Sequence, residues 1–140
     1  MYLRIIAGVL IAAFIAIQFR TVERTNPPVH RDFDGPAEVK EILQRACYDC
    51  HSNETKWPFY SYVAPFSWTV TKDVEEARDE LNFSNWRRMP RVRQFKKKRE
   101  IWDEVDDGKM PLWYYVPLHP GAKLSEHDKD IIREWSRERP

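Results

Sequence analysis

The sequence has no excess of either charge. Its 23 Lys and Arg residues nearly balance 22 Asp and Glu residues, which leaves a formal net charge of +1. Without a strong positive field, nucleic acid is not indicated as a partner. The sequence also lacks internal repeats and low-complexity tracts, which excludes a repeat array. No segment shows the alternating pattern of a strand, so we expect an all-α protein.

Cysteine and glycine are also scarce, with two and four residues in a chain of 140. Ten prolines indicate stiff, extended connections between the helices. Aromatic residues are plentiful by comparison, with six Trp, six Tyr and seven Phe. Such side chains bury large apolar surfaces, as the core of a small domain or the site of a flat apolar ligand requires.

The N-terminal residues 1–20 differ from the rest of the chain. Arg4 precedes an apolar run from Ile5 to Phe19 that only Gln18 interrupts. The length and flanks favour an uncleaved signal anchor that spans a membrane, and a cleaved signal peptide is the alternative. A buried helix fits less well, since the segment is apolar on all sides. Residues 21–35 then resemble an extended polar linker stiffened by two prolines.

Residues 36–138 are expected to form one small helical domain. Apolar residues at helical spacing predict helices over residues 36–47, 66–81, 91–107 and 126–138. Gly108 fits the end of the third helix, and Ser125 with Asp128 resembles a capping box for the last. The stretches between 48 and 65 and between 109 and 124 contain several prolines and are expected to be irregular.

Both cysteines lie in the pentapeptide Cys47-Tyr48-Asp49-Cys50-His51. The pattern C-x-x-C-H is typical of c-type haem attachment. Two thiols at this spacing can add to the two vinyl groups of one haem, and the adjacent histidine can bind the iron. Covalent attachment of one haem through Cys47 and Cys50, with His51 as axial ligand, is therefore the favoured interpretation.

Three other interpretations remain open. A structural zinc site needs about four ligands, and this chain has no second cysteine pair. A thioredoxin-like redox pair belongs beside a βαβ unit, which the sequence does not indicate. A plain disulfide or two free thiols leaves the adjacent His51 unexplained. Haem attachment of this kind occurs outside the cytoplasm, in agreement with the N-terminal segment.

The second axial ligand is sought among methionines and histidines. Met110 follows the expected end of a helix and precedes a proline, so its thioether lies on a constrained loop. His119 is the bis-histidine alternative, and Met89 lies among arginines in a short turn. Met110 is preferred, although it could instead be a core methionine that fills a gap.

Several separate blocks resemble the bacterial haem-binding domain family, which is related to cytochrome c. They are CYDCHSNETKWPFYSYVAPFSW, DVEEARDELNFSNW and GKMPLWYYVPLHPGAKLS. The resemblance covers most of residues 36–136. It implies a cytochrome c-like helical domain with covalent haem at Cys47 and Cys50, His51 as proximal ligand and Met110 as distal ligand. Phe59 and Ala77 depart mildly from the family pattern.

Further residues have possible roles around a haem. Five aromatic residues follow the attachment motif, and at least two of them are expected to contact the haem. They are Trp57, Tyr60, Tyr62, Phe66 and Trp68. Arg78 could pair with a haem propionate, but a solvent-facing arginine is the more ordinary interpretation. The basic stretch Arg87–Arg99 could dock an acidic redox partner or anionic headgroups, or it could be a solvated helix face.

No nucleophile–base pair or carboxylate pair has a motif spacing, so an electron carrier is expected rather than an enzyme. The sequence therefore predicts a membrane-anchored monohaem c-type cytochrome of the bacterial inner membrane, with its haem domain on the periplasmic side. The alternatives are a haem-based gas, redox or partner-binding sensor and a peroxidase-type haem enzyme. A peroxidase-type enzyme needs an open iron site, and rapid ligand binding by the reduced form would support a sensor, whereas the presence of Met110 favours electron transfer.

Overall fold

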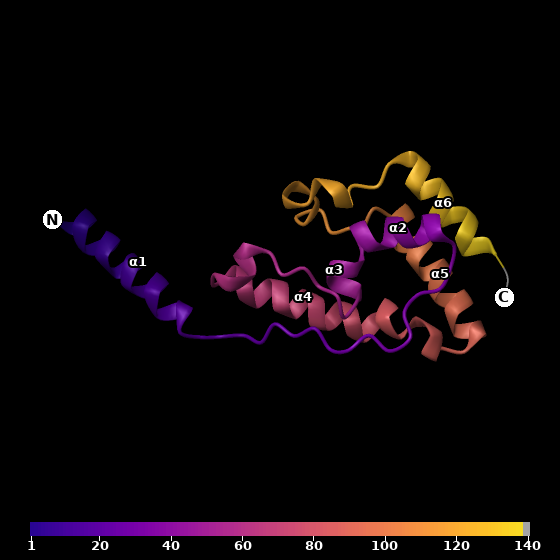
Figure 1. The fold of residues 1–140 in the computed structure, drawn as a ribbon. Coiled ribbons are helices and arrows are strands. Elements are labelled where there is room, and N and C mark those ends of the chain that lie inside the picture. The colour runs from indigo at the N-terminus through magenta and orange to yellow at the C-terminus, as the bar shows by residue number, and fades with distance from the viewer. Residues whose placement is uncertain (139–140) are drawn as a thin grey trace.

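The computed structural model describes residues 1–138, and every regular element in that range is helical. The α-helices are α1 (Tyr2–Gln18), α2 (Ala37–Ala46), α3 (Tyr48–His51), α4 (Phe66–Glu80), α5 (Arg91–Asp106) and α6 (Glu126–Arg137). Short 3-10 helices lie at Phe59–Tyr62, Phe83–Arg88, Val116–Leu118 and Pro120–Ala122. Helices α2 to α6 form one body, and α1 projects from it (Figure 1). The predicted all-α class is confirmed for the described residues.

The long helices α2, α4, α5 and α6 begin and end within about two residues of their predicted positions. Gly108 takes a left-handed φ of 70° just beyond α5, which a residue with a side chain adopts less readily. Helix α6 begins with the predicted capping box between Ser125 and Asp128. Helix α3 was expected to be irregular, because a single turn is too short to show an apolar repeat.

Removal of the cap on α6 is expected to destabilise the protein. The Ser125 hydroxyl accepts a hydrogen bond from the Asp128 N–H at 3.1 Å, and the Asp128 carboxylate accepts one from the Ser125 N–H at 2.7 Å. Ser125→Ala leaves an N–H of the first turn without its acceptor, so the free energy of unfolding should fall by about 1 kcal/mol. Denaturant unfolding measures this. Ser125→Thr keeps the acceptor, and an equal loss in that variant would contradict the capping role.

Helix α1 corrects the prediction of a transmembrane anchor. It has 17 residues and, at about 1.5 Å per residue, is about 25 Å long. The hydrocarbon core of a bilayer is thicker, at about 30 Å. Among residues 1–138, no helix combines the length and the hydropathy that crossing a membrane requires. The predicted anchor is wrong, and so is the inner-membrane location that depends on it.

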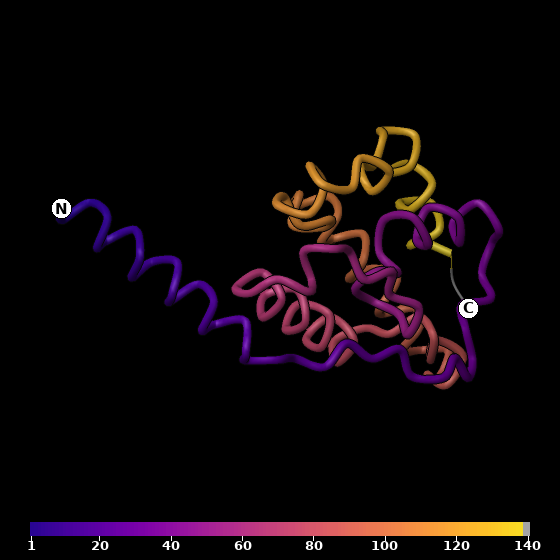
Figure 2. Tube along the Cα trace, turned by 60° about the vertical axis from the view of Figure 1, so that its left-hand side comes forward, coloured from indigo at the N-terminus to yellow at the C-terminus, as the bar shows by residue number. Residues whose placement is uncertain are grey.

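The segment between α1 and α2 is extended and lies against the helical body (Figure 2). Arg24 donates to the Ser61 carbonyl at 3.0 Å, and the Asn26 amide donates to the Thr55 carbonyl at 2.9 Å. Further along, Phe33 is only 2% exposed and is part of the core. The stretch expected to be a linker is therefore held by hydrogen bonds and packing, although it has no regular secondary structure.

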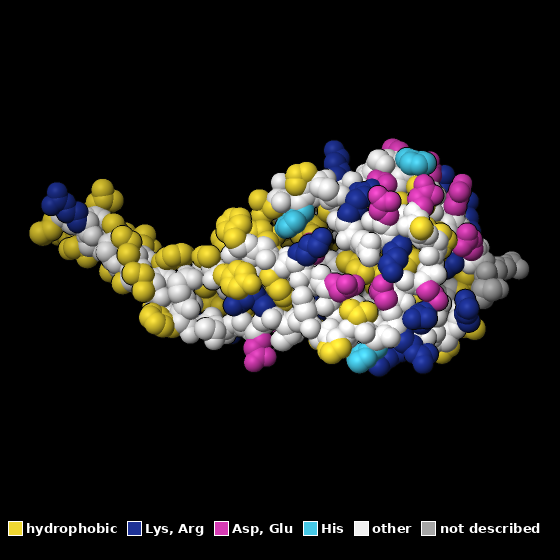
Figure 3. All heavy atoms as spheres, in the orientation of Figure 1, with side chains coloured by type: hydrophobic (Ala, Val, Ile, Leu, Met, Phe, Trp, Pro, Cys, Tyr) yellow, Lys and Arg dark blue, Asp and Glu magenta, His cyan; other side chains and the backbone are white. Residues whose placement is uncertain are grey.

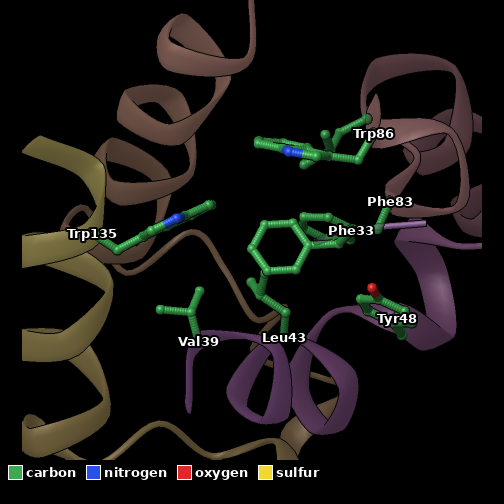
Figure 4. Packing of buried hydrophobic residues seen from close by; sticks show 8 residues of the cluster. Phe33, Val39, Leu43, Tyr48, Phe83, Trp86 and Trp135 are labelled. Atoms are coloured by element: carbon green, nitrogen blue, oxygen red, sulfur yellow. The ribbon is translucent and has the colours of Figure 1, made fainter. Parts of the chain in front are cut away.

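An aromatic cluster makes up half of the core. Phe33 lies at its centre, with edge-to-face contacts to Phe83, Trp86 and Trp135 at centroid distances of 6.0, 5.4 and 5.5 Å (Figure 4). The other buried members are Val39, Leu43, Tyr48 and Leu81. A second cluster comprises Ile42, Ala46, Val105, Ala122, Leu124 and Ile132. Helix α2 contributes to both clusters, so it fixes α3 and the cysteine motif against the rest of the body.

Candidate functional site

The motif Cys47–His51 forms one helical turn. Cys47 is the N-cap of α3, and its carbonyl accepts hydrogen bonds from the Cys50 and His51 N–H groups at 3.2 and 2.8 Å. Both cysteines are free thiols. Burial raises the pKa of each thiol to about 12, so both are protonated at neutral pH. The turn brings two thiols and an imidazole to one cavity wall.

His51 is held by the end of α4. Its Nδ1 lies 3.0 Å from the Ala77 carbonyl and 3.1 Å from the Leu81 carbonyl. Because carbonyls only accept, Nδ1 carries the proton and donates, and Nε2 is the nitrogen with a lone pair for a metal. Burial lowers the pKa of His51 despite these hydrogen bonds, which keeps the ring neutral. A metal-binding histidine is typically oriented in this way.

A cavity of about 630 Å³ opens beside the motif. Helices α3, α4 and α5 and the segment 110–115 line it. Cys47, Cys50 and His51 lie on its wall together with apolar side chains such as Ile101 and Val105. Its volume falls within the range of about 300–1,000 Å³ that is typical of cofactor pockets.

Met110 reaches the same cavity from the end of α5. The Glu104 carbonyl accepts hydrogen bonds from the N–H groups of Lys109 and Met110 at 2.9 and 3.0 Å. With Gly108 in its left-handed conformation, this turn reverses the chain and brings Met110 to the cavity wall. The cavity thus combines two thiols, an imidazole and a thioether. That donor set and the largely apolar surface of the cavity fit a haem.

Comparison with protein families agrees with this chemistry. The family described as "Haem-binding domain" matches residues 12–138. The chain belongs to that family. It therefore binds haem, as the resemblance in the sequence predicted. Neither the curated proteins nor the solved structures include a match to this chain.

The other methionine and histidine considered as iron ligands lie elsewhere in the haem-binding domain. Met89 packs against the aromatic cluster of the core and does not line the cavity among the described residues. His119 stacks on Tyr115 at a centroid distance of 4.0 Å and an interplanar angle of 12°. The cavity wall that the structure describes does not include His119. Of the three candidates, Met110 shares the cavity with His51.

The aromatic residues that follow the motif lie outside the cavity wall. Tyr60 packs edge-to-face with His119 at 6.0 Å, and Trp68 donates its indole N–H to the Arg20 carbonyl at 3.2 Å. The indole N–H of Trp57 is buried and has no hydrogen-bond partner among the described residues. None of these three residues appears in the cavity lining over residues 1–138.

Arg78 forms hydrogen bonds to the segment that precedes α2. Its guanidinium donates to the Ser52 and Thr25 carbonyls at 2.7 and 2.9 Å. It also donates to the side chains of Asn26 and Thr55 at 3.1 and 2.8 Å. All three guanidinium nitrogens are used in these bonds, so Arg78 ties the extended segment to the motif region.

The sequence did not indicate the charged groups around the cavity. Its lining includes the carboxylates of Asp49, Asp73, Glu76, Glu80, Glu100 and Glu104. Lys97 is among the lining residues and forms ion pairs with Glu80 and Glu100. These residues come from three helices, and only the fold brings them together.

Ion pairs neutralise part of the basic stretch Arg87–Arg99. Lys96 pairs with Glu100 at 3.2 Å, and Lys98 pairs with Glu138 at 3.6 Å. Lys98 also lies over the Trp135 ring, 5.0 Å from its centroid. Both signs of charge occur on the visible face of the helical body, and Lys and Arg gather along its lower right edge (Figure 3). The stretch is therefore not a uniformly positive surface.

Proposed function

We propose that this haem-binding domain is a monohaem c-type cytochrome that carries single electrons. Cys47 and Cys50 would hold the haem covalently, and His51 and Met110 would bind its iron. The observation that supports this most strongly is that one cavity collects both thiols, the imidazole and the thioether. Bound haem supplies an iron that alternates between ferrous and ferric states.

The residues of the chain have distinct roles in this proposal. The carbonyls of Ala77 and Leu81 hold His51 in one tautomer and orientation, which raises its basicity as a ligand. Met110 raises the reduction potential relative to a second histidine. The apolar side chains of Ile101 and Val105 would give the haem an apolar surface to pack against. No catalytic side chain is needed for this role.

Attachment requires no further reactant beyond haem. Each thiol would add across one vinyl double bond, so that sulfur bonds to one carbon and the thiol hydrogen goes to the other. Two thioethers would result, with no net gain or loss of electrons. Because both thiols are protonated and buried, we expect a maturation system to make this addition before the domain finishes folding.

Covalent attachment is tested by extraction of haem from denatured protein. The unmodified chain, coexpressed with a cytochrome c maturation system, is expected to retain one haem in intact-mass measurement and after acid–organic extraction. The double variant Cys47→Ala/Cys50→Ala should lose the haem completely under the same treatment. Extraction of haem from the unmodified protein would contradict covalent attachment, but it would leave membership of the family unaffected.

Electron transfer is tested by absorption spectra of the oxidised and reduced protein. Two protein ligands predict low-spin spectra in both states and slow or no binding of carbon monoxide to the reduced form. A high-spin spectrum or rapid carbon monoxide binding would instead favour a gas sensor or a peroxidase-type enzyme, both of which need an open site.

We further propose an acidic redox partner that docks on α5. Helix α5 carries most of the basic stretch Arg87–Arg99 and also contributes Lys97 and Ile101 to the cavity. An acidic partner protein that docks on α5 would therefore lie beside the haem. Attraction of this kind weakens with salt, so the rate of electron exchange with an acidic partner should fall as ionic strength rises.

A further inference from the structure

The segment that carries Met110 forms one wall of the cavity. Met110, Pro111, Leu112, Tyr114 and Tyr115 all line it. A backbone hydrogen bond from the Met110 N–H to the Glu104 carbonyl fixes the beginning of the segment. At the other end, the Tyr115 N–H donates to the Leu112 carbonyl at 3.0 Å, within the segment itself. Attachment to the opposite wall must therefore come from side chains.

Tyr115 provides one such attachment. Its hydroxyl donates to Asp49 Oδ2 at 2.7 Å, and this hydrogen bond is partly buried. Asp49 lies between the two cysteines on α3, and its other oxygen accepts the Lys56 N–H at 3.1 Å. The bond joins residues 66 positions apart. It links the Met110 segment directly to the turn that carries His51.

Tyr114 provides a second attachment to a different helix. Its hydroxyl donates to Asp73 Oδ2 on α4 at 3.0 Å, in a more exposed position. Two consecutive tyrosines thus bind two elements on the histidine side of the cavity. The Tyr115 ring also stacks on His119, which limits its rotation.

We propose that Tyr115 acts through Asp49 as a positioning residue that holds the Met110 thioether in place as an iron ligand. Tyr114 and Asp73 form a weaker second clamp. This inference rests on the proposed role of Met110. A thioether is a neutral, weak ligand, and an external ligand can displace it when the segment moves away. The tyrosine hydrogen bonds oppose that movement, so their strength sets how readily displacement occurs.

The test is a titration of the oxidised, haem-loaded chain with imidazole. Tyr115→Phe removes the hydroxyl and keeps the ring. A partly buried hydrogen bond to a carboxylate stabilises the position of the Met110 segment. Its loss should make Met110 easier to displace and raise the affinity for imidazole about tenfold. Tyr114→Phe should raise it less, because that bond is more exposed. The matched control is Tyr62→Phe, at an exposed tyrosine outside the cavity wall, which should leave the affinity unchanged.

A second variant breaks the same bond from its other end. Asp49→Ala should raise the affinity for imidazole by a similar factor, and the double variant Tyr115→Phe/Asp49→Ala should do no more than either single one. Additive effects, or an unchanged affinity in Tyr115→Phe, would overturn the clamp. The low-spin to high-spin change of Met110→Ala reports separately on the ligand. If Met110→Ala keeps the unmodified spectrum, the ligand assignment fails, and the clamp fails with it.

Discussion

Met110→Ala is expected to convert the haem from a low-spin to a high-spin form. Alanine has no donor atom, so on the proposed ligation the variant would keep only His51 as a protein ligand and would open the position of Met110 on the iron. The reduced variant should then bind carbon monoxide readily, and its reduction potential should fall, because a thioether stabilises the reduced iron relative to water. Absorption spectra and a potentiometric titration measure these changes.

Met89→Ala is the matched control for this experiment. Met89 is half-buried against the aromatic cluster, and it is not among the residues that line the cavity within residues 1–138. This variant should lose some stability and keep the low-spin spectrum. Met110→His should restore a low-spin spectrum at a lower potential, as a second histidine does. A low-spin Met110→Ala variant would show that another side chain binds the iron, with His119 the first to examine.

Local features of the sequence predicted much of the fold. The long helices were identified because their apolar spacing, the Ser125–Asp128 capping box and Gly108 are signals contained within a few residues. The helix of α3 was missed because it is a single turn. The anchor prediction failed on length, since an apolar run does not show where the helix will end. Here α1 ends at Gln18, whose amide bonds both the N–H and the carbonyl of Ala64.

In the candidate site too, the sequence indicated local features and missed non-local ones. The sequence could single out the attachment motif and Met110 as candidates, because C-x-x-C-H has a known chemistry and Met110 lies in a short segment before a proline. The bond between Tyr115 and Asp49 could not, because it spans 66 residues and follows no local rule. The hydrogen bonds of Arg78 to Thr25 and Asn26 are equally non-local. Local periodicity does not encode such pairs, so only the packed fold reveals them.

Phe83→Ala is expected to cause the largest loss of stability. Phe83 is 1% exposed, stacks on Tyr48 at 5.2 Å and meets the edge of Phe33 at 6.0 Å. Truncation of such a buried ring leaves a cavity and should reduce the free energy of unfolding by about 3–5 kcal/mol. Denaturant unfolding of the haem-loaded protein measures this. Phe59→Ala, at a ring 81% exposed, should change it by less than about 0.5 kcal/mol.

Phe83 also lines the cavity, whereas Leu43 is equally buried in the same cluster and does not belong to the described cavity wall. Leu43→Ala should therefore cost about 2–5 kcal/mol and leave the haem spectrum unchanged. Phe83→Ala should alter the spectrum as well, because it removes a wall of the haem site. A spectral change confined to Phe83→Ala would indicate that the haem packs against this face of the core. Equal spectral changes in both variants would instead indicate that loss of core packing reaches the iron ligands. If Phe83→Ala lowered the free energy of unfolding by less than about 1 kcal/mol, the central place of Phe83 in the core would be contradicted.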